Sequence, residues 1–166
     1  DNMACWLFDQ GSLTRRLQER CQGRFSVKVV SQAWQRPMLN EAQRLGIAVN
    51  RLALIRQVYL YCDDTPWVFA RTVIPRSSLG GPRRHLASLG SKPLGAVLFA
   101  DPNMQRDEVE VACICQGQRI FNSAVQALTE TPQQIWGRRS VFYLGKKPLL
   151  VNEVFLPDIL KCNKQT

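Results

Sequence analysis

The alternation of apolar and polar residues along the chain predicts two β-hairpins. Residues 52–62 and 66–75 are rich in β-branched and aromatic side chains, and the turn Asp63-Asp64-Thr65 joins them. A second pair of strand-like runs, 140–144 and 149–156, turns at residues 145–148. Because strands joined by short turns pair in opposite directions, these segments predict an antiparallel sheet.

The remaining patterns predict two further strands, one before the first hairpin and one between the two hairpins, and several short helices. Residues 25–29 alternate as a strand does, and so do residues 106–115, where Cys113 and Cys115 fall on one face that we expect to point inward. Helical spacing or capping residues mark the segments 12–22, 80–90, 92–95 and 118–128. With no repeat or linker in its 166 residues, the chain is predicted to be a single domain, 1–166. The expected fold class is α+β, a single antiparallel β-sheet with helices packed against it.

Two charged residues interrupt otherwise apolar faces of the predicted strands. Arg56 lies among Leu54, Val58 and other apolar residues at the even positions of 52–62, and Glu153 lies between Val151 and Phe155 at the odd positions of 149–156. A charge removed from water must be paired or bind a ligand, because burying it alone costs several kcal/mol. Two hypotheses follow. The residues pair with each other or with other core polar groups, or they form a pocket in which the planar guanidinium recognises a carboxylate.

The positive net charge is the next feature that bears on the ligand. The chain carries a formal charge of +9, but its Lys and Arg residues are scattered in short clusters and no nucleic-acid-binding module is recognisable. We therefore expect no nucleic-acid partner, and a charge that raises the local concentration of small anions. The sequence also lacks an apolar run of about eighteen residues and a basic stretch followed by an apolar core near its start. These absences predict no membrane span and a cytoplasmic location.

The six cysteines suggest neither a metal site nor a disulfide framework. No CxxC pair occurs and His85 is the only histidine, so the usual zinc ligands are lacking and no metal site is expected. Disulfide frameworks are typical of small secreted chains. The prediction is therefore that the cysteines are buried, reduced thiols.

Several motifs together resemble those of the bacterial chorismate lyase family. The resemblance is carried by residues 66–75, 78–82, 89–95, 98–99, Arg106-Asp107 with Glu110, and 147–150, and it is closest in Trp136-Gly137-Arg138-Arg139-Ser140 and Glu153-Val154-Phe155-Leu156-Pro157. These motifs follow one another in the family's order from about Leu52 to Pro157. In one place the chain departs from the family's form, because segment 108–135 is longer. We expect residues 118–134 to add a helix and turn, which would form part of a lid or an accessory surface.

The resemblance implies a cofactor-independent lyase that splits chorismate into 4-hydroxybenzoate and pyruvate, and we expect the chain to be a monomer. The product would supply the aromatic ring precursor for ubiquinone biosynthesis. Carried over residue by residue, the substrate-binding positions are Arg56, Leu94 and Glu153, with Leu13 from a weaker match; Arg56 and Glu153 are also the expected catalytic residues. In the family the arginine holds the ring carboxylate, the glutamate lies near the ring hydroxyl, and the leucines contribute main-chain and apolar contacts.

Two points stay open from the sequence. A second cation for the enolpyruvyl carboxylate could be Arg71 or Arg138, although either could equally be structural. The family's fold is also similar to the effector-binding domain of some bacterial transcription regulators. The alternative function is therefore a non-catalytic, small-molecule-binding domain of the same fold.

Overall fold

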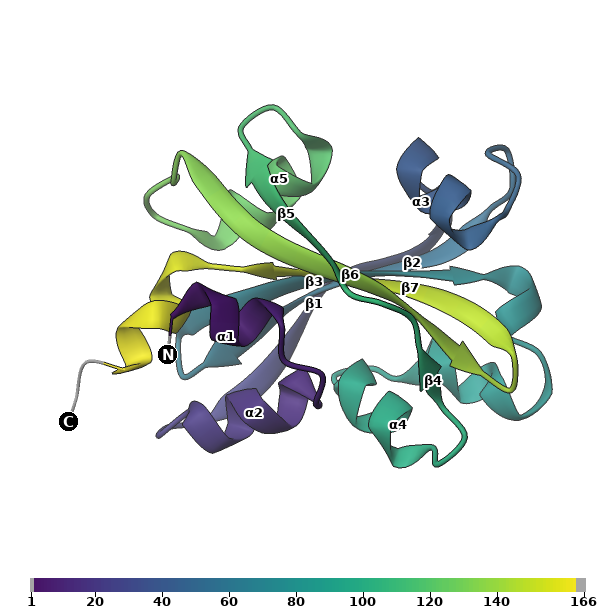
Figure 1. Cartoon of the computed structure of the whole chain (residues 1–166), viewed down its shortest axis with the longest axis horizontal. Coiled ribbons are helices and arrows are strands. Elements are labelled where there is room, and N and C mark those ends of the chain that lie inside the picture. Colours follow the sequence, from purple (N-terminus) through teal and green to yellow (C-terminus); the bar gives the residue numbers. More distant parts are fainter. Residues whose placement is uncertain (1, 164–166) are drawn as a thin grey trace.

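A computed structural model describes residues 2–163, with side chains through Lys161. The described residues form a seven-stranded antiparallel sheet in the order β1-β2-β3-β7-β6-β4, with β5 also paired to β6 (Figure 1). The strands are β1 (Phe25–Gln35), β2 (Ala53–Cys62), β3 (Thr65–Pro75), β4 (Gln105–Arg106), β5 (Glu110–Cys115), β6 (Gln134–Leu144) and β7 (Lys147–Phe155). The predicted fold class, a single antiparallel sheet with helices packed on it, is confirmed.

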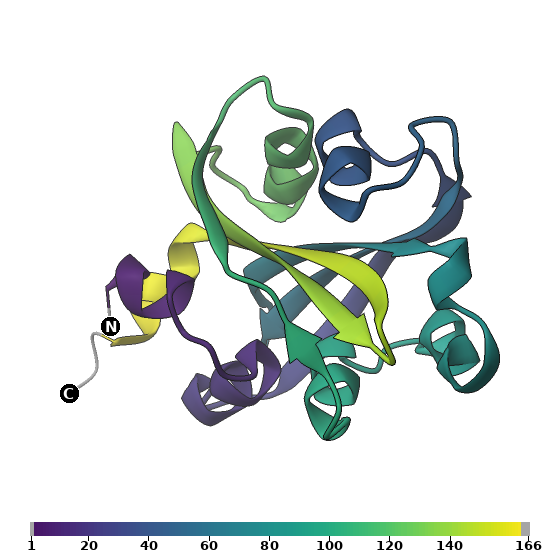
Figure 2. The ribbon, with the colours of Figure 1, turned by 45° about the vertical axis from the view of Figure 1, so that its right-hand side comes forward.

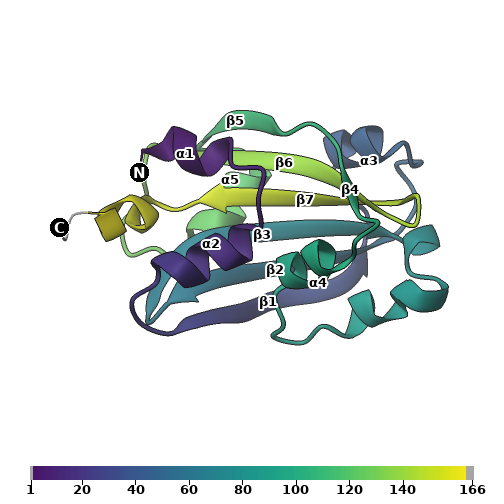
Figure 3. The ribbon, with the colours of Figure 1, turned by 60° about the horizontal axis from the view of Figure 1, so that its bottom comes forward.

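The sheet separates two layers of short helices (Figure 2). One face, called the front face here, is the face onto which Arg56 and Glu153 point; α1 (Met3–Leu7), α2 (Leu13–Arg20) and α4 (Leu94–Ala100) cover it (Figure 3). The opposite back face carries α3 (Leu39–Leu45) and α5 (Arg119–Ala124). Single-turn or irregular 3₁₀ segments occupy Arg76–Ser78, Gly81–Ser88, Val125–Ala127 and Pro157–Asn163.

Hydrophobic packing on each face follows the two-residue period of the strands. On the front face, Leu17 of α2 is completely buried against Val58 and Leu60 of β2. On the back face, Phe121 of α5 packs with Tyr59 and other buried residues. Burying one such large apolar side chain contributes roughly 1.5–3 kcal/mol, so these contacts hold helices that are too short to be stable alone.

The pairing of the strands determines how far apart Arg56 and Glu153 lie. Ala70 of β3 pairs with Val58 of β2 on one side and with Glu153 of β7 on the other, while Arg56 pairs with Thr72. Arg56 and Glu153 therefore share the front face, but the whole width of β3 lies between their strands. A gap of this kind on one face of a sheet leaves room for a ligand.

The cysteine prediction is wrong for the pair that the structure joins. Cys21 and Cys62 form a disulfide across 41 residues of sequence, with their Cα atoms 5.6 Å apart. The reason is the antiparallel pairing of β1 with β2, which places Phe25 opposite Cys62 and so brings the end of α2 to the end of β2. Cys5 is exposed, and the side chain of Cys162 lies outside the described residues.

The inward orientation expected for Cys113 and Cys115 is also wrong. Cys115 is exposed and Cys113 is only half-buried, whereas Ile114 between them is buried. Strand β5 lies at the edge of the sheet, where α5 covers the back face over Ile114, and Cys113 and Cys115 alternate onto the opposite face. The face of β5 that is buried is therefore the one that carries Ile114, and not the one that carries the two cysteines.

The longer segment forms an accessory surface and no part of a lid on the front face. Helix α5 and the turn after it pack on the back face, where Phe121 and Ala124 are buried. Tyr59 fixes this turn, because its hydroxyl donates to the carbonyl of Ser123 at 2.8 Å and accepts from the amide of Ala127 at 3.3 Å. Helix α5 and the turn after it therefore lie across the sheet from Arg56 and Glu153.

Other boundaries differ more modestly from the predicted ones. Strand β1 continues to Gln35 after an irregularity between Val29 and Ser31, and β6 begins at Gln134, six residues before the predicted hairpin. Helix α3 lies in a segment that carried little sequence signal; it is held by Glu41, whose carboxylate accepts from the amide of Met38 at 2.8 Å.

Candidate active site

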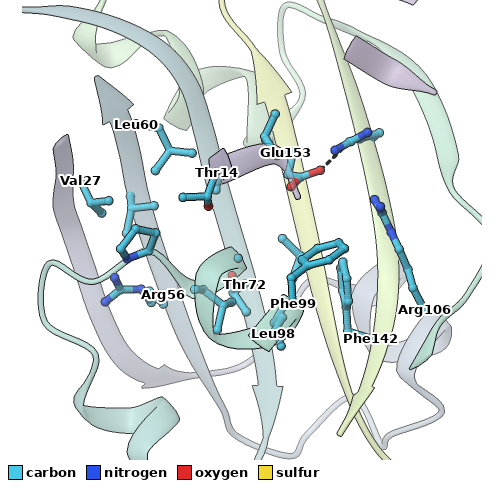
Figure 4. A pocket seen from close by; sticks show the side chains of 18 of the residues that line it. Thr14, Val27, Arg56, Leu60, Thr72, Leu98, Phe99, Arg106, Phe142 and Glu153 are labelled. Atoms are coloured by element: carbon cyan, nitrogen blue, oxygen red, sulfur yellow. Dashed lines mark hydrogen bonds and ion pairs between the residues drawn. The ribbon is translucent and has the colours of Figure 1, made fainter. Parts of the chain in front are cut away.

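A cavity lies on the front face between the sheet and helices α2 and α4 (Figure 4). It measures about 50 Å³, several times the roughly 10–15 Å³ that one water molecule needs on the same scale. Most of the wall is apolar. The lining residues are Gly11, Leu13, Thr14, Val27, Arg56, Val58, Leu60, Ala70, Thr72, Pro93, Leu94, Gly95, Leu98, Phe99, Arg106, Arg138, Phe142, Val151 and Glu153. All four residues predicted to bind substrate (Leu13, Arg56, Leu94 and Glu153) therefore line one cavity.

Arg56 is a buried cation whose partners are neutral. It is 2% exposed, and its guanidinium donates to Gln32 Oε1 at 3.1 Å and to the carbonyls of Gly90 and Lys92 at 2.8 and 3.2 Å. No carboxylate of the described residues forms an ion pair with it. Burial lowers the pKa of the Arg56 guanidinium below its ordinary value, as expected for a desolvated positive charge. Such a group favours an anionic ligand.

Glu153 pairs with Arg138 rather than with Arg56. The two residues are opposite one another on β7 and β6, and Arg138 Nε donates to Glu153 Oε2 at 2.6 Å. The other oxygen, Oε1, accepts no hydrogen bond from the described residues. The carboxylate therefore faces the cavity with one acceptor free (Figure 4). The two predicted charges therefore do not pair with each other, and each instead pairs with other polar groups, which is the other part of that hypothesis.

Arg138 also binds the chain that precedes α2. Its Nη1 donates to the carbonyls of Trp6 and Asp9 at 2.9 and 2.6 Å, and the side chain is almost completely buried. Of the two proposed second cations, Arg138 is thus in the cavity wall but already occupied. Arg71 is not in the cavity, because it points to the back face and forms a buried ion pair with Glu41 at 2.7 Å.

Leu13 and Leu94 are the first residues of α2 and α4. Amides in the first turn of a helix have no partner within that helix, so both leucines bring main-chain donors as well as apolar side chains to the wall. The two helices approach closely at Gly95, where a Cβ atom would lie 2.6 Å from Thr14 Oγ1. This contact closes the cavity on the side away from the sheet.

Arg106 is a charged lining residue that the alternation of apolar and polar positions did not indicate. Strand β4 has only two residues, too few for an alternating pattern, although Arg106-Asp107 belongs to the motifs that carried the resemblance. Arg106 Nε donates to Ser140 Oγ at 3.0 Å, and its guanidinium lies 5.0 Å from the ring centre of Phe142. Burial, as the largest influence, lowers the pKa of Arg106 below its ordinary value.

The described residues contain no group of three His, Cys, Asp or Glu side chains arranged to hold a metal ion. Among the described helices, none has the length and apolar character needed to cross a bilayer.

Comparison with known proteins decides the family. The family model "Chorismate lyase" matches residues 2–164. The chain belongs to the chorismate lyase family. Two relatives named "Probable chorismate pyruvate-lyase" are similar to it over most of their length. The protein from Nitrosospira multiformis is 42% identical over 94% of this chain and 87% of its own, and that from Aromatoleum aromaticum is 44% identical over 94% and 85%.

Solved structures show the same fold in more distant proteins. PhnF from Mycobacterium smegmatis matches this chorismate lyase family member with a TM-score of 0.64 at 13% identity, over 91% of this chain and 66% of PhnF. The C-terminal domain of the histidine utilization repressor from Pseudomonas syringae pv. tomato matches with a TM-score of 0.59 at 11% identity, over 81% and 93%. At this level of identity the likeness concerns the fold alone.

Proposed function

We propose that the chain catalyses the elimination of pyruvate from chorismate to form 4-hydroxybenzoate. The observation that carries the proposal is the front-face cavity and the two charged groups that line it. Arg56 is a buried guanidinium without a carboxylate partner among the described residues, and Glu153 has one carboxylate oxygen free of hydrogen bonds from them. Strand β3 separates the strands that carry the two residues. A carboxylate and a hydroxyl at opposite ends of one ring match these two groups. Membership of the chorismate lyase family and the names of the relatives support the same substrate.

The reaction needs few catalytic groups because its product is aromatic. The bond between the ring and the enolpyruvyl oxygen breaks, that oxygen keeps the electron pair, and the neighbouring ring carbon loses its proton. The released enolate then gains a proton on carbon and becomes pyruvate. Electrons and atoms balance without an oxidant or a reductant, and we propose that no cofactor takes part.

Arg56 binds the ring carboxylate in this proposal. The planar guanidinium suits a bidentate contact with a carboxylate, and three neutral hydrogen-bond partners already fix its orientation. The amides at the starts of α2 and α4, at Leu13 and Leu94, donate to the polar groups of the ligand, while the leucine side chains pack on its ring. Such fixed contacts hold the substrate in a reactive shape and keep water out.

Glu153 accepts a hydrogen bond from the ring hydroxyl. Arg138 holds Oε2 of Glu153, so that Oε1 remains available to the ligand. The ring carbon that loses its proton also bears this hydroxyl, so Glu153 lies beside the reacting bond. We assign it a positioning role, since aromatisation already supplies the driving force.

We further propose that the enzyme is a cytoplasmic monomer whose product supplies the ring precursor for ubiquinone. The experiment that tests the function is direct. Purified chain is mixed with chorismate, 4-hydroxybenzoate is followed by its absorbance and pyruvate by a coupled dehydrogenase, before and after dialysis against EDTA. Equal release of both products, unchanged by EDTA, is expected; activity that EDTA abolishes and a divalent ion restores contradicts the cofactor-free mechanism.

The fold is shared with the C-terminal domain of a repressor, and the alternative function that we consider is a ligand-binding domain without turnover. This alternative predicts that chorismate or a similar ring acid binds to the chain and is recovered unchanged. Binding without pyruvate release would therefore replace the lyase proposal with the binding one.

A further inference from the structure

We propose that Arg106 binds the carboxylate of the enolpyruvyl group and thereby holds the leaving half of the substrate. The inference rests on the proposed function in taking chorismate, a dianion, as the ligand. It assigns the second negative charge of that ligand to a residue on β4, at the opposite side of the cavity from Arg56 (Figure 4).

The charges in the cavity wall support a ligand with two negative charges. Three guanidinium groups and one carboxylate line the cavity, those of Arg56, Arg106, Arg138 and Glu153. Arg138 and Glu153 neutralise each other, and among the described residues no carboxylate pairs with Arg56 or Arg106. Arg56 is buried and Arg106 is half-buried, and removing an unpaired cation from water in this way is costly unless an anion neutralises it. Two carboxylates on one ligand would satisfy both.

The contacts of Arg106 leave part of its guanidinium free. Nε donates to Ser140 Oγ at 3.0 Å and Nη1 makes a long contact of 3.4 Å with the carbonyl of Gln10, while Nη2 donates to none of the described residues. The ring of Phe142 supports the plane of the group from one side. Arg106 is therefore oriented in advance and retains donors for a carboxylate.

The geometry of chorismate places its second carboxylate on the Arg106 side. The enolpyruvyl ether is bonded to the ring carbon next to the one that bears the hydroxyl. With the ring carboxylate on Arg56 and the hydroxyl on Glu153, the ether must project from the Glu153 end of the ring. Arg106 lies at that end, where its charge interacts with those of Glu153 and Arg138.

This placement also gives Arg106 a part in the reaction. Negative charge builds up on the ether oxygen as the bond to the ring breaks, and a cation beside the departing group stabilises that charge. The product 4-hydroxybenzoate lacks the enolpyruvyl group, so its binding should not need Arg106. This difference separates the role of Arg106 from that of Arg56.

The test compares Arg106→Met, Arg106→Lys and Arg139→Met with the wild-type chain. Arg139 is the matched control, because it is the neighbour of Arg138 on β6, pairs with Glu110 and lies outside the front cavity. We expect Arg106→Met to lower kcat/KM for chorismate by roughly a hundredfold or more, as for the loss of one partner of a buried charge pair. Arg106→Lys should recover part of this loss. The Kd for 4-hydroxybenzoate, measured by calorimetry, should stay within about threefold in every variant.

Three results decide against the proposal. Normal kcat/KM in a folded Arg106→Met variant overturns it, and so does an equal loss in Arg139→Met, which would indicate a general charge effect. Loss of 4-hydroxybenzoate binding in folded Arg106→Met would show that the residue shapes the whole cavity. If the wild-type chain binds chorismate without releasing pyruvate, the lyase function fails, but a selective loss of chorismate binding in Arg106→Met still supports the assignment.

Discussion

Arg138 joins Glu153, which lines the cavity, to the N-terminal segment. The guanidinium donates to Glu153 Oε2 at 2.6 Å and, from its other side, to the carbonyls of Trp6 and Asp9. One buried side chain therefore fixes both the carboxylate that faces the ligand and the chain that leads into α2. Because α2 begins with Leu13, the same arginine indirectly positions part of the opposite wall.

Replacing Arg138 by methionine should destabilise the fold severely. The change leaves the Glu153 carboxylate buried without a partner, and breaking a buried pair in this way costs about 3–5 kcal/mol. Urea unfolding of the single variants and of the double variant Arg138→Met/Glu153→Gln measures the coupling between the two residues. We expect the double variant to be more stable than Arg138→Met alone; additive effects would contradict the ion pair.

Glutamine at position 153 separates positioning from proton transfer. An amide oxygen can still accept from the ring hydroxyl, so Glu153→Gln should keep kcat within about tenfold and raise KM. A general base at this position would instead lose roughly a hundredfold or more in kcat, together with one limb of the pH–rate profile. The measurement is kcat against pH for both proteins, and a collapse of kcat with intact substrate affinity assigns Glu153 the proton-transfer role.

Arg56 and Arg71 make a matched pair of buried arginines on opposite faces of the sheet. Arg56→Met should abolish most turnover and also weaken 4-hydroxybenzoate binding, while Arg56→Lys should restore only part because an ammonium lacks the planar fork. Arg71→Met should instead lower the free energy of unfolding, since it leaves Glu41 unpaired, with little change in the Kd for product. Full activity in Arg56→Met would return this residue to a structural role.

The Cys21–Cys62 disulfide should be visible in thermal unfolding. Closing a loop of 41 residues stabilises a fold by about 4 kcal/mol through the unfolded chain, which corresponds to a Tm difference of roughly 10 °C for a domain of this size. We expect dithiothreitol to lower the Tm of the wild-type chain by about this amount. The Tm of the Cys21→Ser variant should be the same with and without dithiothreitol. An equal Tm with and without reductant would show that the thiols are not joined.

The sequence could predict the strands that carry Arg56 and Glu153 because both have a regular two-residue period. That period indicates the shared face within each strand, but not which strands are neighbours. The insertion of β3 between β2 and β7 is a property of the whole sheet, and it determines that the two charges are separated and do not pair.

Arg106 and the disulfide could not be predicted for a related reason. A strand of two residues is too short to show a period. The contacts that orient the Arg106 side chain are made with Ser140 and Phe142, which are more than thirty residues away in sequence. Cys21 and Cys62 become neighbours only through the pairing of β1 with β2. Contacts of this kind arise from tertiary structure, and local patterns do not contain them.

The absence of a side chain at Gly95 has a consequence for the time scale of turnover. Thr14 and Phe99 line both the inner cavity and a groove on the outer surface between α2 and α4, so the contact at Gly95 separates a bound molecule from bulk water. We expect exchange of ligand to require these two helices to move apart. The residence time of the product is then governed by how often that helix contact opens, a step that limits kcat in many enzymes with closed sites.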